Sequence, residues 1–171
     1  RLYLLNKDSS KIVYISEYNN QNTYRTRNNA WPGNDRENGT IYSNHKNINT
    51  VRHSIYSFLN GDYEKSYSYW DENAEVNDIN LSEPITLSDA KKANEELMKN
   101  FTFDAADEVG YPDYLEYDLW ESKDVLSWWK FRMTRKSDGK KIVLPIHYIH
   151  GFDNEGKIIN VTMYFNASLM Q

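Results

Sequence analysis

The chain of 171 residues contains no cysteine, which excludes disulfides, thiolate metal sites and a cysteine nucleophile. It also has no apolar run that approaches the ~20 residues needed for a membrane helix, so no membrane partner is expected. Acidic residues outnumber basic ones, 25 to 20, which gives a formal net charge of −5. This balance argues against a nucleic-acid surface, which normally shows clustered lysine and arginine.

Charged residues make up 26% of the chain and aromatic residues 15%, a composition typical of globular rather than disordered proteins. The length suits one domain, or one domain with an appendage. The first residue is an arginine and no signal peptide follows it. A cytoplasmic protein and one exported after removal of an N-terminal segment both remain open.

The last third of the chain predicts an antiparallel meander. Residues 128–166 contain three strand-like runs joined by two turns, SDGKK at 137–141 and DNEGK at 153–157. A glycine in each turn can take the positive φ of a tight connection. The flanking runs are rich in Ile, Val, Tyr and Phe, which favour strands.

The N-terminal segment resembles the end of the chain. Residues 2–20 can be laid over residues 148–166, with Val13 on Ile159 and a polar turn before both. Internal sequence similarity of this kind is typical of repeated architecture, although any two amphipathic hairpins look alike at this length. Residues 1–20 are predicted to form a β-hairpin, and one interpretation makes this hairpin the remnant of a preceding repeat.

Residues 21–48 are crowded with Asn, Gly and Thr and show no sustained period, so they are predicted to be a linker or a long surface loop. The remaining residues, 49–171, are predicted to form one domain that opens with three helical patterns. The first ends at Gly61, the second begins at an Asp62 cap, and the third begins at a capping-box-like Thr86.

Alternating strands follow over 114–120, 125–134 and 142–149. Each has one strongly apolar face, and a helical layer is the natural cover for that face. The pattern therefore predicts an α+β domain with segregated elements.

These elements, taken in order, resemble the NTF2-like superfamily, in particular its SnoaL-like branch. The pieces that carry the resemblance are NGD at 60–62, YWDENAEVND at 69–78 and DNEGKIINVTMYFN at 153–166. The resemblance covers roughly residues 49–166. It implies a cone-shaped barrel, in which three N-terminal helices pack on a curved, mainly antiparallel sheet around a deep pocket. It also implies frequent homodimers packed through the sheet.

The superfamily contains isomerases, dehydratases, epoxide hydrolases and polyketide cyclases, and also members that only bind or assemble, so the fold leaves the function open. Its enzymes use a buried carboxylate or histidine with a shifted pKa. The candidate catalytic residues are His147, Asp78 and Asp118. Each also has a plainer interpretation: a hydrogen-bonded or surface histidine, a solvated acidic loop around Asp78, and a solvent-facing Asp118.

The candidate ligand-binding residues are Trp70, Trp120, Trp128, His150, Tyr164 and Asn166. The aromatic ones can form a wall for a flat hydrophobic ligand, or can simply be core or interface residues. Asn166 stands where SnoaL-like chains commonly carry an acid; its amide cannot transfer protons but can orient a ligand carbonyl. His147 and His150 should point to opposite faces of one strand, so no metal site is expected, and no cofactor.

Three functions remain for this sequence. A binding module for a small hydrophobic or aromatic ligand is slightly favoured, because no residue argues firmly for catalysis. The alternative is a cofactor-independent lyase, isomerase or hydrolase that uses a buried His or Asp. The third is a structural or dimerisation module. The sequence leaves the ligand, the reaction, the compartment and the oligomeric state open.

Overall fold

The structure, a computed structural model, describes residues 2–5, 12–16, 39–42, 44–117 and 121–171. The chain falls into two compact units, Arg1–Glu37 and Asn38–Gln171. The second unit therefore begins at residue 38, ahead of the predicted boundary at residue 49, and includes part of the predicted linker.

The first unit contains a two-stranded sheet. β1 (Leu2–Leu5) pairs antiparallel with β2 (Ile12–Ser16), and a register shift leaves Val13 without a Cα partner. The last hairpin of the chain shifts in the same way at Ile159, the residue onto which the sequence comparison places Val13. The shared shift is in favour of a repeat, which stays a prediction.

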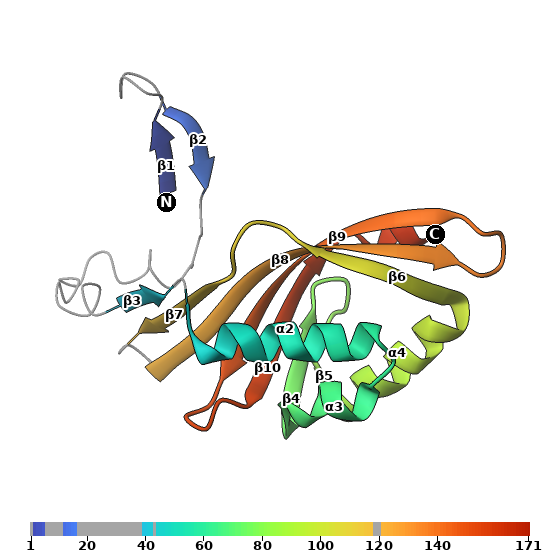
Figure 1. Ribbon diagram of the computed structural model, residues 1–171, viewed down its shortest axis with the longest axis horizontal. Coiled ribbons are helices and arrows are strands. Elements are labelled where there is room, and N and C mark those ends of the chain that lie inside the picture. Colours follow the sequence, from blue (N-terminus) through green and yellow to red (C-terminus); the bar gives the residue numbers. More distant parts are fainter. Residues whose placement is uncertain (1, 6–11, 17–38, 43, 118–120) are drawn as a thin grey trace. The chain divides into compact units, whose positions relative to one another are not determined.

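The second unit is a helical layer packed on an eight-stranded sheet (Figure 1). The helices are α2 (Lys46–Leu59), α3 (Tyr63–Ser68) and α4 (Leu87–Asn100), and the 3-10 helix η4 (Ala167–Met170) follows the last strand. The strands are β3 (Gly39–Tyr42), β4 (Trp70–Asp78), β5 (Ile85–Thr86), β6 (Phe101–Glu108), β7 (Asp113–Tyr117), β8 (Ser122–Arg135), β9 (Lys141–Phe152) and β10 (Ile158–Phe165).

The strands follow the order β3-β7-β8-β9-β10-β4-β5, and β6 pairs with β8 beside this path. Every pair is antiparallel except β10 with β4, which is parallel. No helix in the described ranges is both long and apolar enough to cross a membrane.

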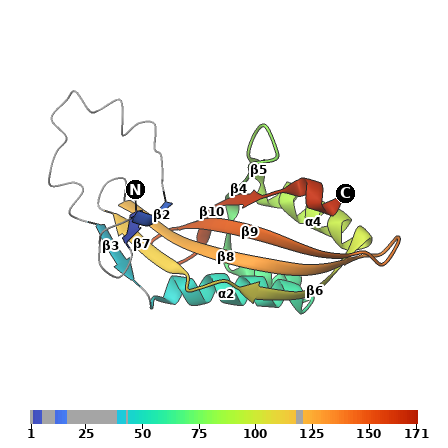
Figure 2. The ribbon, with the colours of Figure 1, turned by 90° about the horizontal axis from the view of Figure 1, so that it is seen from above.

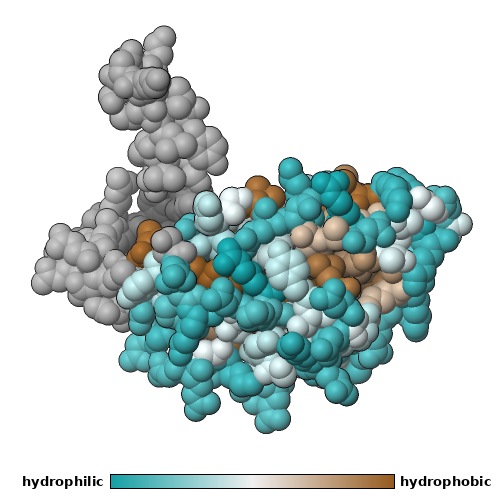
Figure 3. Space-filling model, in the orientation of Figure 1, coloured by the Kyte–Doolittle hydropathy of each residue, from teal (hydrophilic) through white to brown (hydrophobic). Residues whose placement is uncertain are grey.

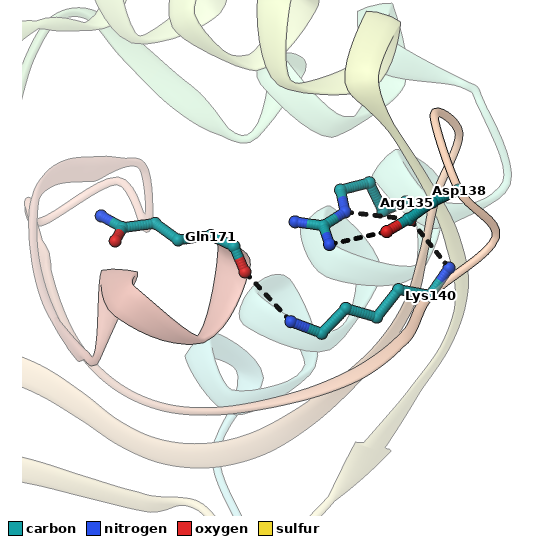
Figure 4. Close-up of polar contacts among 4 residues, drawn as sticks. All are labelled: Arg135, Asp138, Lys140 and Gln171. Atoms are coloured by element: carbon teal, nitrogen blue, oxygen red, sulfur yellow. Dashed lines mark hydrogen bonds and ion pairs between the residues drawn. The ribbon is translucent and has the colours of Figure 1, made fainter.

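The predicted meander is confirmed as β8, β9 and β10. Gly139 and Gly156 take φ values of +72° and +87° in its two turns, the conformation that those turns require. Polar contacts hold the β8–β9 turn (Figure 4). Arg135 donates two hydrogen bonds of 3.0 and 2.8 Å to the Asp138 carboxylate, and Lys140 Nζ donates to the backbone oxygen of Gln171 at 3.0 Å.

Two parts of the predicted architecture are wrong. The sheet is curved but open, because the strand path does not return to its first strand, so it is not a closed barrel. The three helices do not all precede the sheet, since β4 and β5 lie between α3 and α4. The sequence 69–78 contains β4, in which buried Ala74 and Val76 alternate with exposed neighbours. β4 pairs mainly with β10, which is remote in the chain, and its nearby partner β5 has only two residues. No strong local hairpin pattern therefore marked β4 as a strand.

β6 is a further strand that the sequence did not predict. Phe101 has helical spacing with the apolar residues before it, but it caps α4 and begins β6. The helix ends there because Phe101 has extended backbone angles.

One face of the sheet, here named the helix-side face, packs against α2 and α4. On β8 this face carries the odd-numbered residues from Val125 to Met133, which are all buried. Ile55 of α2 and Leu97 of α4 pack against the largest buried cluster on this face. Figure 2 shows α2 running along the sheet strands, and Figure 3 shows a largely hydrophilic surface over the helical layer. The opposite side of the sheet is named the outer face.

Two polar connections position α2. Ser66 Oγ of α3 donates to the Ser54 carbonyl oxygen at 2.8 Å, in buried surroundings. Arg52 donates two hydrogen bonds of 2.9 and 2.8 Å to the Glu108 carboxylate of β6. Paired, planar contacts of this kind define orientation as well as distance.

Thr86 provides a test of the local helix signal. Its Oγ1 accepts a hydrogen bond from the Asp89 backbone N–H at 3.1 Å, which confirms the predicted cap of α4. Thr86→Ala should lower the free energy of unfolding by about 1 kcal/mol, because an amide at the helix start loses its partner. Urea denaturation of the two proteins measures this difference. Thr86→Ser is the control and should stay close to the wild type; an equal loss in both variants would contradict the capping role.

Candidate functional site

Three polar side chains that the structure describes are buried on the helix-side face, and each has an atom that could form a hydrogen bond with a ligand. Ser127, Trp129 and His150 are 0, 1 and 3% exposed. Within the described residues, Ser127 Oγ, Trp129 Nε1 and His150 Nδ1 have no hydrogen-bond partner. Buried polar atoms are normally paired, and an unpaired one costs free energy. These atoms therefore mark a place where a ligand or a water molecule would find donors and acceptors.

Strand pairing arranges these residues in neighbouring rows across the sheet. Ser127 of β8, Tyr148 of β9, Met163 of β10 and Asp78 of β4 are successive Cα partners. The adjacent row on one side consists of Val125, His150, Val161 and Val76, and that on the other side of Trp129, Ile146 and Phe165. These three rows, named the helix-side rows, combine an apolar surface with a few polar groups, as ligand sites usually do.

Trp70 closes one end of the helix-side rows. Its indole Nε1 donates a hydrogen bond to Ser54 Oγ of α2 at 3.0 Å, which holds the ring in place. The Trp70 ring meets the His150 ring edge-on, with centroids 6.0 Å apart and an angle of 72° between the planes. Two of the predicted ligand-binding residues, Trp70 and His150, therefore lie together.

The ionisable groups in the middle of the rows are uncharged at neutral pH. Burial lowers the pKa of His150 to about 3. Burial also raises the pKa of Tyr148, and the nearby charge of Asp78 adds to this effect. A general base works best with a pKa close to the working pH. His150 and Tyr148 are therefore better suited to hydrogen bonding with an uncharged ligand than to proton transfer at neutral pH.

Another set of predicted residues lies on the outer face. His147 stacks between Trp128 and Tyr164, with ring centroids 4.7 and 5.7 Å away. His147 and His150 thus face opposite sides of β9, as the spacing predicted. Burial lowers the pKa of His147, although its hydrogen bond to the Ser127 carbonyl opposes this shift. The predicted catalytic residue His147 cannot act together with Asp78, because the sheet separates them.

The other candidates have different positions. Asp78 ends β4 and accepts hydrogen bonds from the backbone N–H and side-chain amide of Asn80, at 2.8 and 2.7 Å. It belongs to a strand and not to the acidic loop considered for it. Asn166 caps η4, since its Oδ1 accepts a hydrogen bond from the Ser168 backbone N–H at 3.0 Å. Asp118 and Trp120 lie outside the described residues.

Two hollows among the described residues lie apart from Ser127, Tyr148 and His150. One, of about 480 Å³, separates α3 from α4 and is bordered by Tyr63, Tyr67, Lys91 and Met98. The other, of about 270 Å³, lies on the outer face beside Trp128, Pro145, His147 and Tyr164. Between the helices and the rows, hydrophobic side chains such as those of Leu97 and Met163 pack against the buried cluster.

Ser127 and Tyr148 are site residues that sequence reasoning missed, whereas Trp129 belongs to the aromatic residues that could form a wall for a ligand. One signal was available for Ser127, which interrupts the apolar face of a strand predicted over 125–134. A polar residue at a core position is informative. Tyr148 gave no such signal, because aromatic residues are common on a core face. Among the described residues, no three His, Asp or Glu side chains are placed to share a metal ion.

No protein-family model matches the chain, and no curated protein matches it significantly. Several solved structures, in contrast, are similar to this chain. A "putative isomerase" from Bacillus subtilis is 16% identical, with a TM-score of 0.60 over 72% of this chain and 88% of the other. A "putative polyketide cyclase" from Pseudomonas putida KT2440 is 16% identical, with a TM-score of 0.58 over 72% and 94%. An NTF2-like protein of unknown function from Burkholderia pseudomallei K96243 is also 16% identical, with a TM-score of 0.56 over 74% and 95%. Similarity at this level of identity establishes the fold alone.

His150→Leu tests the burial of the neutral imidazole. Unfolded His150 takes up a proton below about pH 6.5, whereas the folded protein does not until about pH 3, so the unfolded state binds more protons as the pH falls. The wild type should therefore lose about 1.4 kcal/mol of unfolding free energy per pH unit between about pH 6 and pH 3, relative to the variant.

Urea denaturation of both proteins across this pH range measures the difference. Other titrating groups, such as Asp124, are common to both proteins and cancel. At pH 7 the variant should be at least as stable as the wild type, because an unpaired buried nitrogen is removed. Parallel pH profiles would show that His150 is protonated normally in the folded state.

Proposed function

The chain has the NTF2-like fold, and on that premise we propose that it is a small-molecule-binding domain for an uncharged hydrophobic or aromatic ligand. The site is the helix-side rows, where the ligand lies among Trp70, Trp129 and Tyr148. The observation that carries the proposal is the presence of unpaired polar atoms, Ser127 Oγ and His150 Nδ1, on an otherwise apolar buried face.

The chemistry of the rows favours an uncharged ligand with a polar edge. Aromatic side chains supply apolar contact area, and Ser127 Oγ or Trp129 Nε1 can donate to a ligand carbonyl or hydroxyl oxygen. His150 and Tyr148 carry no charge at neutral pH, so a charged ligand would be buried without a partner among them. Such burial is unfavourable.

Met163 provides a way to make room for the ligand. It lies in the same row as Tyr148 and Asp78, between them, and is partly buried. An unbranched thioether side chain adapts its shape easily. Movement of Met163 would open space beside Tyr148 without a change in the sheet.

A second candidate function is a SnoaL-type cofactor-independent lyase, isomerase or hydrolase. Names of structural neighbours, an isomerase and a polyketide cyclase, are consistent with this class. The shared row of Asp78 and Tyr148 favours it. Asp78 would remove a proton from a carbon next to a carbonyl, while the Tyr148 hydroxyl donates a hydrogen bond to the developing oxyanion. His147 takes no part in this arrangement, because it lies on the outer face.

The third candidate, a structural or dimerisation module, would need no ligand on the helix-side rows. The packed side chains there are consistent with this role, and the outer face would supply the contact of a homodimer. The unpaired polar atoms argue against it, because a purely structural core would be more stable with apolar residues at positions 127 and 150.

Binding of 2-tetralone, measured by calorimetry, tests the proposal. This uncharged aromatic ketone should bind more tightly than tetralin, which lacks the oxygen, or tetralin-2-carboxylate, which is charged. The double variant Ser127→Ala, His150→Leu should weaken 2-tetralone binding about three- to tenfold, the value of one neutral hydrogen bond. His147→Phe on the outer face is the control and should leave it unchanged. Equal affinities of the wild type for 2-tetralone and tetralin would contradict the proposal.

The same ketone separates binding from catalysis. In D₂O the enzyme candidate predicts faster exchange of the protons next to the carbonyl of 2-tetralone, seen by proton NMR. Asp78→Asn should then abolish the acceleration while binding persists. A domain that only binds the ketone should leave the exchange rate at its uncatalysed value in both proteins.

A further inference from the structure

The outer face contains a hollow in which a histidine side chain has a fixed orientation. The space, about 270 Å³, is bordered by Val109, Trp128, Trp129, Lys130, Pro145, Ile146, His147 and Tyr164. Val109 and Tyr164 are 41 and 44% exposed, so the hollow is accessible in the described structure. Its borders are mainly apolar, and its size suits a one-ring molecule rather than a protein segment.

The hydrogen bond of His147 decides which ring nitrogen carries the proton. His147 Nδ1 lies 3.0 Å from the Ser127 carbonyl oxygen. A carbonyl oxygen can only accept, so Nδ1 carries the hydrogen and donates it. In the neutral ring, Nε2 is then left with a free lone pair. Stacking between Trp128 and Tyr164 holds the ring in this orientation.

The neighbouring part of the outer face is charged. Arg132 forms an ion pair of 2.7 Å with Asp107, and Lys141 forms one of 3.2 Å with Asp104. Lys130 pairs in register with both Asp107 and Pro145. The two ion pairs lie beyond the hollow, and Lys130 forms its charged edge. The apolar strip is therefore confined to the hollow, whereas a stable protein interface normally needs about 800 Å² on each partner.

We propose that this hollow is a second binding site, which takes a small uncharged aromatic molecule with one O–H donor, such as a phenol. The ring lies against Val109, Pro145 and Tyr164, and the hydroxyl donates its hydrogen to His147 Nε2. The site is independent of the proposed function, because neither Ser127, Tyr148 nor His150 borders it.

The donor requirement follows from the fixed tautomer. A neutral imidazole with its hydrogen on Nδ1 offers only an acceptor at Nε2, so a ligand that brings only an acceptor gains nothing there. A phenol offers a strong donor and an apolar ring of the right size. Burial lowers the pKa of His147, which keeps this acceptor available at neutral pH.

Calorimetry with p-cresol and 4-methylanisole tests the proposal. The two molecules have similar shapes, but only p-cresol carries an O–H donor. The wild type should bind p-cresol about five- to tenfold more tightly, the difference expected for one hydrogen bond. His147→Phe keeps an aromatic ring in the stack but removes the acceptor, so it should bind both molecules equally. Ser127→Ala, which keeps the carbonyl that holds His147, should retain the preference.

Tyr164→Ala provides a second variant at an exposed position, where loss of folding is not expected. It should weaken both probes alike, because it removes one wall of the hollow, while the Ser127 carbonyl and the Trp128 ring still hold the imidazole and its Nε2 in place. Equal binding of the two probes by the wild type, or an unchanged preference in His147→Phe, would overturn the proposal. A dimer in sedimentation that Tyr164→Lys dissociates, with no binding of p-cresol by either form, would assign the hollow to a second copy of the chain.

Discussion

The pairing of β9 with β8 on one side and with β10 on the other determines which side chains share a face. Successive residues of a strand alternate between the two faces of the sheet. A shift of one residue in the pairing would therefore move every side chain of β9 to the opposite face. The register that exists directs Leu144, Ile146 and Tyr148 toward the helices. The same register separates His147 from His150, and with them the two candidate sites.

Burial then gives the two histidines different properties. His150 lies among Trp70, Tyr148 and the buried strand residues, and desolvation suppresses its charged form. His147 is only half-buried, and the Ser127 carbonyl fixes its tautomer. Ser127 contributes to both sides of the sheet, through its side chain on the helix-side face and its carbonyl beside His147. A neutral imidazole on each face is an acceptor or donor of hydrogen bonds rather than a charge, so both proposals involve uncharged ligands.

The resemblance to the NTF2-like superfamily was correct about the mixed α+β fold with a curved sheet, and the site residues drawn from it stay predictions. It implied a deep pocket and an acid at the end of the last strand. In the structure, Asn166 caps η4, and neither of the two hollows described above is bordered by Ser127, Tyr148 or His150. The polar groups that distinguish the rows belong to Ser127, His150, Tyr148 and Asp78, of which His150 and Asp78 were candidates from the sequence. Asp78 joins the others through the parallel pairing of β4 with β10, a contact between segments far apart in the chain.

Local signals in the sequence determined the cap of α4 at Thr86, the turns at Gly139 and Gly156, and the meander of β8, β9 and β10. Each of these depends on residues a few positions apart, such as a hydroxyl beside a free amide or a glycine where φ is positive. The opposite orientation of His147 and His150 also followed from the period of a strand. Only the tertiary structure decided that 70–78 is a strand, that the sheet stays open, and that Ser127, Tyr148 and Asp78 form one row. These outcomes depend on pairing between distant segments and on the desolvation that pairing produces, and neither can be calculated from a local pattern.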